Sequence, residues 1–379
     1  MRRLIGMVLC LAVAAGTARA QKATLTVTNP LDRARPDAIC IGPASLLGEH
    51  ARPGAYTGVT ETGETVAVQV DDIDGTGTPD EFVMVLDLDA GASRTIWVDL
   101  GRPWEGSSRV DVRTSWRWEG YAALETELQA FGLYGIYAPL DFPPSLQWDL
   151  YGKRPEARGL SLDALEPVNY HEDNPVAVDY LLVGQSLGLG GPILGKGRPC
   201  HGENGSYVYR EICDGPVRAG LEVVVTGWST PSGGSHHAGM QYFVYAGHDF
   251  IDAGWTLMPP AGAGDNFGVG IRRIQHPEMF LSSDREGILA TMGQQEGIIG
   301  LTGLAVIFEP DRFLRWGVLS DGGDSYVVYL TPEGQEDRSF YRTRLVGLWS
   351  ESGIATAETS AEHLRDLAQR QHNPVTITQ

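Results

Sequence analysis

Apolar and polar residues alternate along most of this chain, in short runs that end at Gly, Pro or Asp. The alternation is clear at residues 23–29, 65–70 and 81–88. Because successive side chains of a β-strand point to opposite faces, these runs predict half-buried strands. Turn residues lie between them, so together they predict a small β-sandwich that ends near residues 102–103.

A second and longer set of strands follows this first group. They are predicted at residues 207–212, 220–227, 240–245, 254–258, 301–308, 326–330 and 343–349. Helical periodicity is confined to residues 360–371, where Ser360 is the expected N-cap and Leu364 and Leu367 share one side. The pattern therefore predicts an all-β protein with an N-terminal domain at residues 21–102 and a larger antiparallel β-domain with a C-terminal helix at residues 103–379.

The first twenty residues have the parts of a secretory signal peptide. Arg2 and Arg3 precede an apolar run at residues 4–15, and Ala-Arg-Ala at 18–20 is a small-x-small cleavage signal. That run is too short to span a bilayer and no later run is longer, so we expect no membrane span. These features predict a secreted or periplasmic protein.

The charge of the chain limits its partners. Removing the signal peptide takes the net charge from −19 to −22, because three arginines leave with it. So acidic a protein is a poor partner for nucleic acid. A cationic pocket inside an acidic shell can still bind a single sugar carboxylate.

Three cysteines remain after the signal peptide. Cys200 and Cys213 flank a predicted hairpin, and in an oxidising compartment they are expected to form a disulfide. Cys40 is expected to be a small buried residue.

The segment Gly184–Gly188 has the G-x-S-x-G pattern of a serine-hydrolase nucleophile elbow. That motif must open a helix, and the Gly and Pro residues at 189–192 and 195–197 forbid one. A phosphate-binding loop fails for lack of Gly-Lys-Ser/Thr. We therefore expect a loop that bends sharply or approaches a ligand closely.

Two metal sites are considered from the sequence. Asp72, Asp74 and Asp80 lie in a calcium-like run of alternate oxygen ligands, although Thr76 replaces a third carboxylate, so a plain Asp/Gly turn explains the run as well. A zinc site needs His171, His201 and either His236 or His237 to converge from distant strands. We expect that the protein requires no cofactor, although these residues could bind calcium or zinc.

Aromatic and basic residues concentrate in two stretches. The first holds Trp116, Arg117, Trp118, Tyr121, Tyr134, Tyr137, Trp148, Tyr151, Lys153, Arg154, Tyr170 and His171, and the second runs from Lys196 to Arg210. Sugar rings stack on aromatic faces while Arg, Lys and His bind carboxylates, so this mixture fits a uronic-acid site. An ordinary aromatic core explains about half of these residues.

Several segments together resemble one family. Tyr170-His171, Asp-Tyr-Leu-Leu-Val-Gly-Gln-Ser-Leu-Gly at 179–188, Arg-Trp-Glu at 117–119, Asp-Leu-Tyr-Gly-Lys-Arg at 149–154 and Gly-Pro-Val-Arg-Ala at 215–219 resemble the domain of unknown function family DUF4861. The likeness covers nearly the whole chain after the signal peptide. One departure is Leu182, which stands where a lysine is expected in the family.

The resemblance implies a large antiparallel sandwich of the galactose-mutarotase type and a place in polysaccharide degradation. One member of the family is known as an ulvan-oligosaccharide dehydratase, which removes water from a non-reducing-end glucuronic acid. We therefore expect a secreted carbon-oxygen lyase, acting on ulvan or another glucuronic or galacturonic polymer, which leaves a 4,5-unsaturated uronyl end.

Dehydration needs a base, an acid and a cation for the carboxylate. His171 is expected as the base, Tyr134, Tyr207 or Tyr209 as the acid, and Arg154, Arg210 or Lys196 as the cation. The further residues expected to bind substrate are Arg117, Glu119, Trp148, Asp149, Tyr170, His201, Tyr207 and His237.

Three alternatives stay open at this point. A glycoside or uronyl hydrolase would use two carboxylates, among Glu119, Asp141, Asp149 and Asp179, about 5 to 10 Å apart. A non-catalytic carbohydrate-binding protein would keep the aromatic residues without an acid and a base. A zinc-assisted lyase would need the histidine convergence described above.

Overall fold

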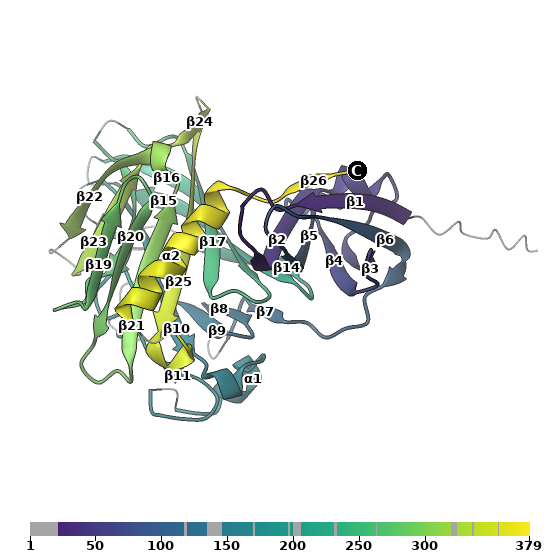
Figure 1. Ribbon diagram of the computed structural model, residues 1–379. Helices are drawn as coiled ribbons and strands as arrows, with labels where there is room; N and C mark the ends of the chain where they lie inside the picture. Colours follow the sequence, from purple (N-terminus) through teal and green to yellow (C-terminus); the bar gives the residue numbers. More distant parts are fainter. Residues whose placement is uncertain are drawn as a thin grey trace, which may run out of the picture.

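The computed structural model describes residues 22–116, 120–134, 146–169, 171–195, 198–199, 206–230, 233–262, 264–319, 324–335, 337–354 and 356–379. Within them the chain forms three antiparallel sheets and one long helix (Figure 1). The prediction of an all-β protein is confirmed. No helix in this part of the chain is long and apolar enough to cross a membrane.

The first sheet has seven strands in the order β2-β5-β4-β3-β6-β1-β26. Its strands are β1 (Lys22–Thr28), β2 (Arg35–Pro43), β3 (Gly54–Thr60), β4 (Thr65–Asp71), β5 (Glu81–Leu88), β6 (Ser93–Pro103) and β26 (Thr376–Thr378), and η1 (Ala44–Leu47) follows β2. It encloses a core of its own, which includes Leu25, Val68 and Phe82. The last strand of the chain pairs with the first, Thr26 opposite Thr378, so both ends of the described chain build this sheet.

The second sheet has ten strands, with the main path β22-β23-β18-β12-β10-β9-β8-β7. Its members are β7 (Val110–Arg113), β8 (Tyr121–Thr126), β9 (Gln129–Tyr134), β10 (Trp148–Gly152), β11 (Val178–Asp179), β12 (Leu189–Leu194), β13 (Arg198–Pro199), β18 (Phe267–Arg272), β22 (Phe313–Leu319) and β23 (Ser325–Leu330). The short helices η2 (Pro155–Ala157) and α1 (Leu162–Leu165) lie between β10 and β11. The apolar run at 178–183 is therefore a strand only at its first two residues.

The third sheet has nine strands, with the main path β14-β15-β16-β17-β25-β21-β20-β19. Its members are β14 (Ser206–Asp214), β15 (Arg218–Ser229), β16 (Ser235–Tyr245), β17 (Phe250–Met258), β19 (Met279–Ser283), β20 (Ile288–Gln294), β21 (Leu301–Phe308), β24 (Glu333–Gln335) and β25 (Arg338–Trp349), and η4 (Pro310–Arg312) and η5 (Ser350–Ser352) are short turns of helix. The second and third sheets pack face to face around one large core, which includes Trp148, Tyr242 and Leu345. This arrangement confirms the predicted large antiparallel sandwich.

Helix α2 (Ala357–His372) lies across β20 and β21 on the outer side of the third sheet (Figure 1). Leu364 and Leu367 are buried, as predicted. The predicted N-cap was wrong, because Thr356 caps the helix in a reciprocal pair of hydrogen bonds with Thr359. Ser360 lies within the first turn, where its hydroxyl donates to the Met292 sulfur at 3.1 Å.

The predicted disulfide was wrong. Cys213 is a free, buried thiol on β14, and Cys200 lies outside the described residues. The Cys213 sulfur packs over Gly220 on the neighbouring strand. A Cβ added to Gly220 would lie 3.1 Å from this sulfur. Burial raises the pKa of this thiol, which makes it unreactive. Cys40 is buried and free, as expected.

Candidate functional site

A group of tyrosines and carboxylates occupies the outer face of the second sheet, the face turned away from the large core. The strand register sets Tyr121 opposite Tyr134, Asp149 opposite Gly132, and Tyr151 opposite Asp179. Cross-strand partners share a face, so these side chains gather on one side. Gly132 makes this possible, because a Cβ there would stand 2.0 Å from the Tyr121 hydroxyl.

Hydrogen bonds join the members of this group. The Tyr134 hydroxyl donates to Oδ2 of Asp149 at 3.3 Å, and Oδ1 of Asp149 accepts from the Leu150 N–H at 2.9 Å. The hydroxyls of Tyr121 and Tyr151 are 2.5 Å apart. Tyr134 is half-buried and Asp149 is 2 % exposed, so this hydrogen bond links the buried carboxyl group to a side chain that is partly exposed.

The two aspartates differ from ordinary surface carboxylates. Burial raises the pKa of Asp149 well above its usual range, and the nearby charge of Asp179 raises it further. Burial also raises the pKa of Asp179, while its hydrogen bond to His171 opposes that rise. Asp149 therefore holds its proton more strongly than a surface carboxyl group does, as a general acid must.

His171 lies at the exposed edge of this group. Its Nδ1 is 2.9 Å from Oδ2 of Asp179, and its side chain is 61 % exposed while that of Asp179 is 7 % exposed. A carboxylate that accepts from Nδ1 fixes the tautomer in which Nε2 carries the lone pair. A histidine held in this way can act as a general base towards a substrate on the surface.

Arg272 is a further member of the site that the sequence analysis did not identify. Trp148 pairs with Leu189 and Leu189 with Ile271, and the Arg272 N–H donates to the Gly188 carbonyl at 2.7 Å. Asp149 on β10 and Arg272 on β18 therefore lie at the same level of the sheet, with β12 between them. Their backbones are roughly 10 Å apart, which is the distance across two neighbouring strand pairs. It is half-buried and burial lowers its pKa.

The segment 183–188 turns around the Arg272 side chain. Arg272 Nη1 donates to the Val183 carbonyl at 2.8 Å, and Gly184 adopts a φ of +54°, which favours glycine. The Ser186 hydroxyl is buried and donates to the same carbonyl at 2.6 Å. The loop therefore bends sharply, which was one of the two roles expected for these glycines.

Lys153 and Glu125 form a wholly buried ion pair on the same face of the second sheet as the site. Lys153 Nζ donates to Glu125 at 2.5 Å and to the carbonyls of Thr126 and Gly159. Glu125 also accepts from the N–H and the hydroxyl of Ser161, at the start of α1. The pair therefore fixes the segment that leads from β10 to His171.

The other predicted residues within the described chain are not part of this group. Arg154 is near the His171 loop, where it pairs with Asp173 at 2.8 Å and covers the Trp349 ring at 5.4 Å. Trp148 is fully buried in the large core, so a sugar cannot stack on it. His237 is exposed on β16 of the third sheet, on the face opposite to buried His236.

The predicted residues of β14 also belong to the third sheet. Tyr207 is 8 % exposed, and it packs with Tyr209 against the large core, where burial raises the pKa of the Tyr209 hydroxyl. Arg210 pairs with Glu222 at 2.9 Å and donates to the Ile73 carbonyl at 2.8 Å. None of the three joins His171. Arg117, Glu119, Asp141, Tyr170, Lys196 and His201, like the predicted signal peptide, lie outside the described residues.

The Asp-rich turn follows β4. Oxygen atoms of Asp72, Asp74 and Asp80 lie within 4.8 Å of one another, and the same carboxylates accept N–H groups of their own loop, including those of Thr76 and Gly77. Both the calcium and the plain-turn interpretations fit this geometry. In the part of the chain that the structure describes, this is the one group of three or more His, Cys, Asp or Glu residues with metal-binding spacing.

The fold is shared with larger sugar hydrolases. An alpha-mannosidase from Enterococcus faecalis V583 is similar with a TM-score of 0.54 at 11% identity, over 94% of this chain and 46% of that one. A glycosyl hydrolase family 38 protein from Enterococcus faecalis is similar with a TM-score of 0.53 at 10% identity, over 94% of this chain and 47% of the other. The chain thus spans about half the length of these proteins, and the likeness is one of fold.

The sequence itself matches one family. This chain belongs to the family described as Domain of unknown function (DUF4861), over residues 27–377. The resemblance seen in the sequence is therefore confirmed. A comparison with curated proteins gave no match.

Proposed function

We propose that this protein is a carbohydrate-active enzyme that removes water from the terminal uronic acid of an acidic oligosaccharide. The observation that carries the proposal is the pair of exposed His171 with Asp179, on the same face of the second sheet as the buried Asp149–Tyr134 pair and with Arg272 in the row of Asp149. A base, an acid and a cation are the three groups that this reaction requires. The fold shared with an alpha-mannosidase supports a sugar as the substrate.

In the proposed reaction Arg272 binds the uronate carboxylate, which makes the neighbouring C5–H bond more acidic. His171 takes that proton at Nε2, the electron pair of the C–H bond forms the C4–C5 double bond, and the C4–O bond breaks. The Tyr134 hydroxyl gives its proton to the departing hydroxyl, which leaves as water, and Asp149 replaces the tyrosine proton with its own. His171 is left protonated and Asp149 ionised, and exchange with solvent restores both.

A uronyl hydrolase is the second candidate, because Asp149 and Asp179 stand diagonally across β10 and β11. Diagonal neighbours are roughly 7 Å apart, which is within the range for a pair of hydrolytic carboxylates. Dehydration is favoured because Asp179 is engaged by His171 and both carboxyl groups are buried. A direct attack on an anomeric carbon would need one of them at the surface.

The test is incubation of the purified protein with oligosaccharides of ulvan, glucuronan and pectin, followed by ultraviolet absorbance and mass spectrometry. Dehydration gives new absorbance and the loss of one water without chain cleavage. Cleavage with new absorbance would indicate a lyase, cleavage with added water a hydrolase, and binding without change a binding protein.

Matched variants locate the chemistry. His171→Ala and Tyr134→Phe are expected to lose most of the turnover, whereas His237→Ala, an exposed histidine of the third sheet, is expected to keep it. Full turnover by His171→Ala would remove this residue from the mechanism.

A further inference from the structure

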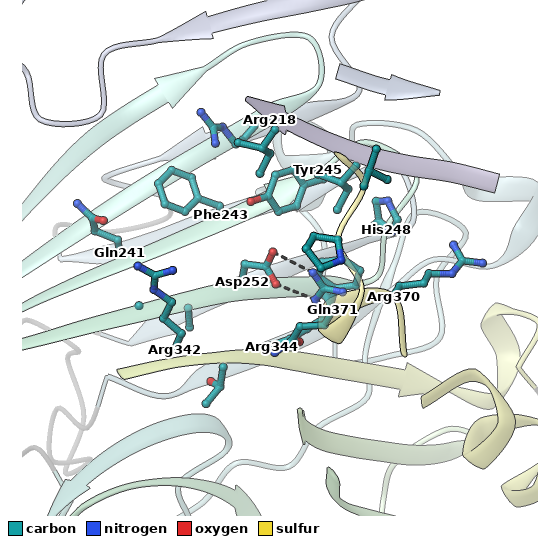
Figure 2. Close-up of a pocket in the computed structure, with 18 of the residues that line it drawn as sticks. Arg218, Gln241, Phe243, Tyr245, His248, Asp252, Arg342, Arg344, Arg370 and Gln371 are labelled. Carbon is teal, nitrogen blue, oxygen red and sulfur yellow. Dashed lines mark hydrogen bonds and ion pairs between the residues drawn. The ribbon is translucent and has the colours of Figure 1, made fainter. Parts of the chain in front are cut away.

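A cleft lies on the other side of the sandwich from the His171 site. This cleft of about 840 Å³ separates the first sheet from the outer face of the third sheet, and the end of α2 closes one side (Figure 2). Its walls come from β2, the Asp-rich turn, β16, β17 and β25. The His171 site lies on the outer face of the second sheet, so the large core separates the two.

The floor of the cleft is a short polar row on the third sheet. Gln241 pairs with Gly254, and Gly254 pairs with Arg342, so the three lie side by side across β16, β17 and β25. A Cβ on Gly254 would meet no atom within 4 Å, which leaves open space between the two polar side chains. The half-buried ring of Phe243 adjoins this row and adds an apolar surface (Figure 2).

Most cations of the cleft are already neutralised. Arg218 is held by Asp71 and Glu81, and Arg344 forms two hydrogen bonds with Asp252 at 2.7 and 3.0 Å. These groups are structural.

Arg342 differs from them. It is exposed, and its side chain has no hydrogen bond or ion pair with any residue that the structure describes. It is therefore available to an anionic group of a ligand.

Two more lining residues carry unsatisfied buried atoms. Arg35 is 3 % exposed, and among the described residues its Nε has no hydrogen-bond partner, nor has Oε1 of Gln371. Buried polar atoms without partners are rare in folded proteins because each one costs free energy. A ligand that offers both a donor and an acceptor would satisfy the two.

The acidic lining residues restrict the kind of anion. Glu309 and Glu333 line the same cleft as Arg342. They would repel a compact anion such as phosphate, but they can accept hydrogen bonds from hydroxyl groups. A hydroxyl-rich chain that carries spaced carboxylates fits both the acids and the arginine, and 840 Å³ is within the range of cavities that hold such ligands.

We infer that this cleft is a second carbohydrate site, which binds a uronate-containing oligosaccharide with Arg342 on a carboxylate. The choice of ligand deepens the proposed function, since a second site would keep the enzyme on its polymer. The evidence for this second site is the cleft and its lining residues, and it does not depend on a catalytic role for His171.

The test is isothermal titration of the His171→Ala protein with a uronate oligosaccharide of about eight sugars, and with a neutral cello-oligosaccharide of equal length. Two binding events per chain are expected with the uronate chain. Arg342→Ala or Gly254→Trp is expected to weaken one event at least tenfold and leave the other unchanged. Arg338→Ala, on the same strand outside the cleft, is the matched control.

The outcomes separate the two proposals. Uronate binding that neither Arg342→Ala nor Gly254→Trp weakens overturns the cleft site, as does equal affinity for the neutral chain. If those variants abolish one event in a protein whose wild type converts no uronate oligosaccharide, the cleft site stands and the dehydratase proposal fails. If the wild type converts the uronate oligosaccharide and titration shows a single binding event that neither variant weakens, the dehydratase proposal stands and the cleft site fails.

Discussion

Replacing Lys153 by Met tests how the candidate site is held in place. The variant keeps the aliphatic part of the side chain, but it removes the ammonium group that donates hydrogen bonds to Glu125 and to the carbonyls of Thr126 and Gly159. Both side chains of the ion pair are fully buried, so Glu125 would be left as an uncompensated charge. Removing one partner of a buried pair costs about 3–5 kcal/mol.

The double variant Lys153→Met/Glu125→Gln makes the prediction specific. The glutamine oxygen can still accept from the Ser161 N–H, which Glu125 now accepts at 2.7 Å, but it carries no charge. It should recover about 1–3 kcal/mol relative to Lys153→Met alone. Urea unfolding followed by tryptophan fluorescence measures both values. A loss below about 1 kcal/mol in the single variant, or a double variant no more stable than the single, would refute the reasoning.

Four further predictions concern the site and the pH dependence of the protein. Asp149→Asn should lower kcat about 100-fold or more. Because the acid form is the active one, wild-type kcat should fall as pH rises through the raised Asp149 pKa, and the variant should lack this limb of the pH profile. Arg272→Ala should lower kcat/KM for a uronate substrate roughly 10- to 100-fold, with partial recovery in Arg272→Lys, and equal kinetics in all three proteins would contradict its role. Leu182, 47% exposed, should accept Lys with a change within about 0.5 kcal/mol in urea unfolding, and the added cation should lower KM for the uronate substrate. Burial lowers the pKa of His248 from 6.5 to about 4, so only the unfolded chain binds this proton between those values, and stability falls as pH falls. Wild type should therefore lose on the order of 3 kcal/mol more than His248→Phe between pH 7 and pH 4, and parallel losses in urea unfolding would contradict the assignment.

The strands were predictable because alternation is a local property. The predicted runs at 220–227, 301–308 and 343–349 lie inside β15, β21 and β25. The helix start was misplaced because its cap depends on a pair of threonines, Thr356 and Thr359, whose role the apolar periodicity does not reveal. Of the apolar run at 178–183, only the first two residues pair with β10. The run then turns towards Arg272.

The candidate site was predictable only in part. Tyr134, Asp149 and His171 were identified from residue type and resemblance, and the structure brings them together through Asp179. Tyr209 was chosen for the same chemical reasons, yet its strand belongs to the other sheet. Residue type indicates what a side chain can do but does not show its neighbours.

The sequence by itself determined the all-β class, the family and the chemistry of the side chains, because strand alternation and residue types are read along the chain. Tertiary structure decided which residues meet. The register of β10, β12 and β18 places Arg272 in the row of Asp149, and burial sets the pKa of that carboxyl group. Both effects depend on contacts between residues far apart in the chain, such as Trp148 with Leu189 and Leu189 with Ile271, and no local pattern encodes them.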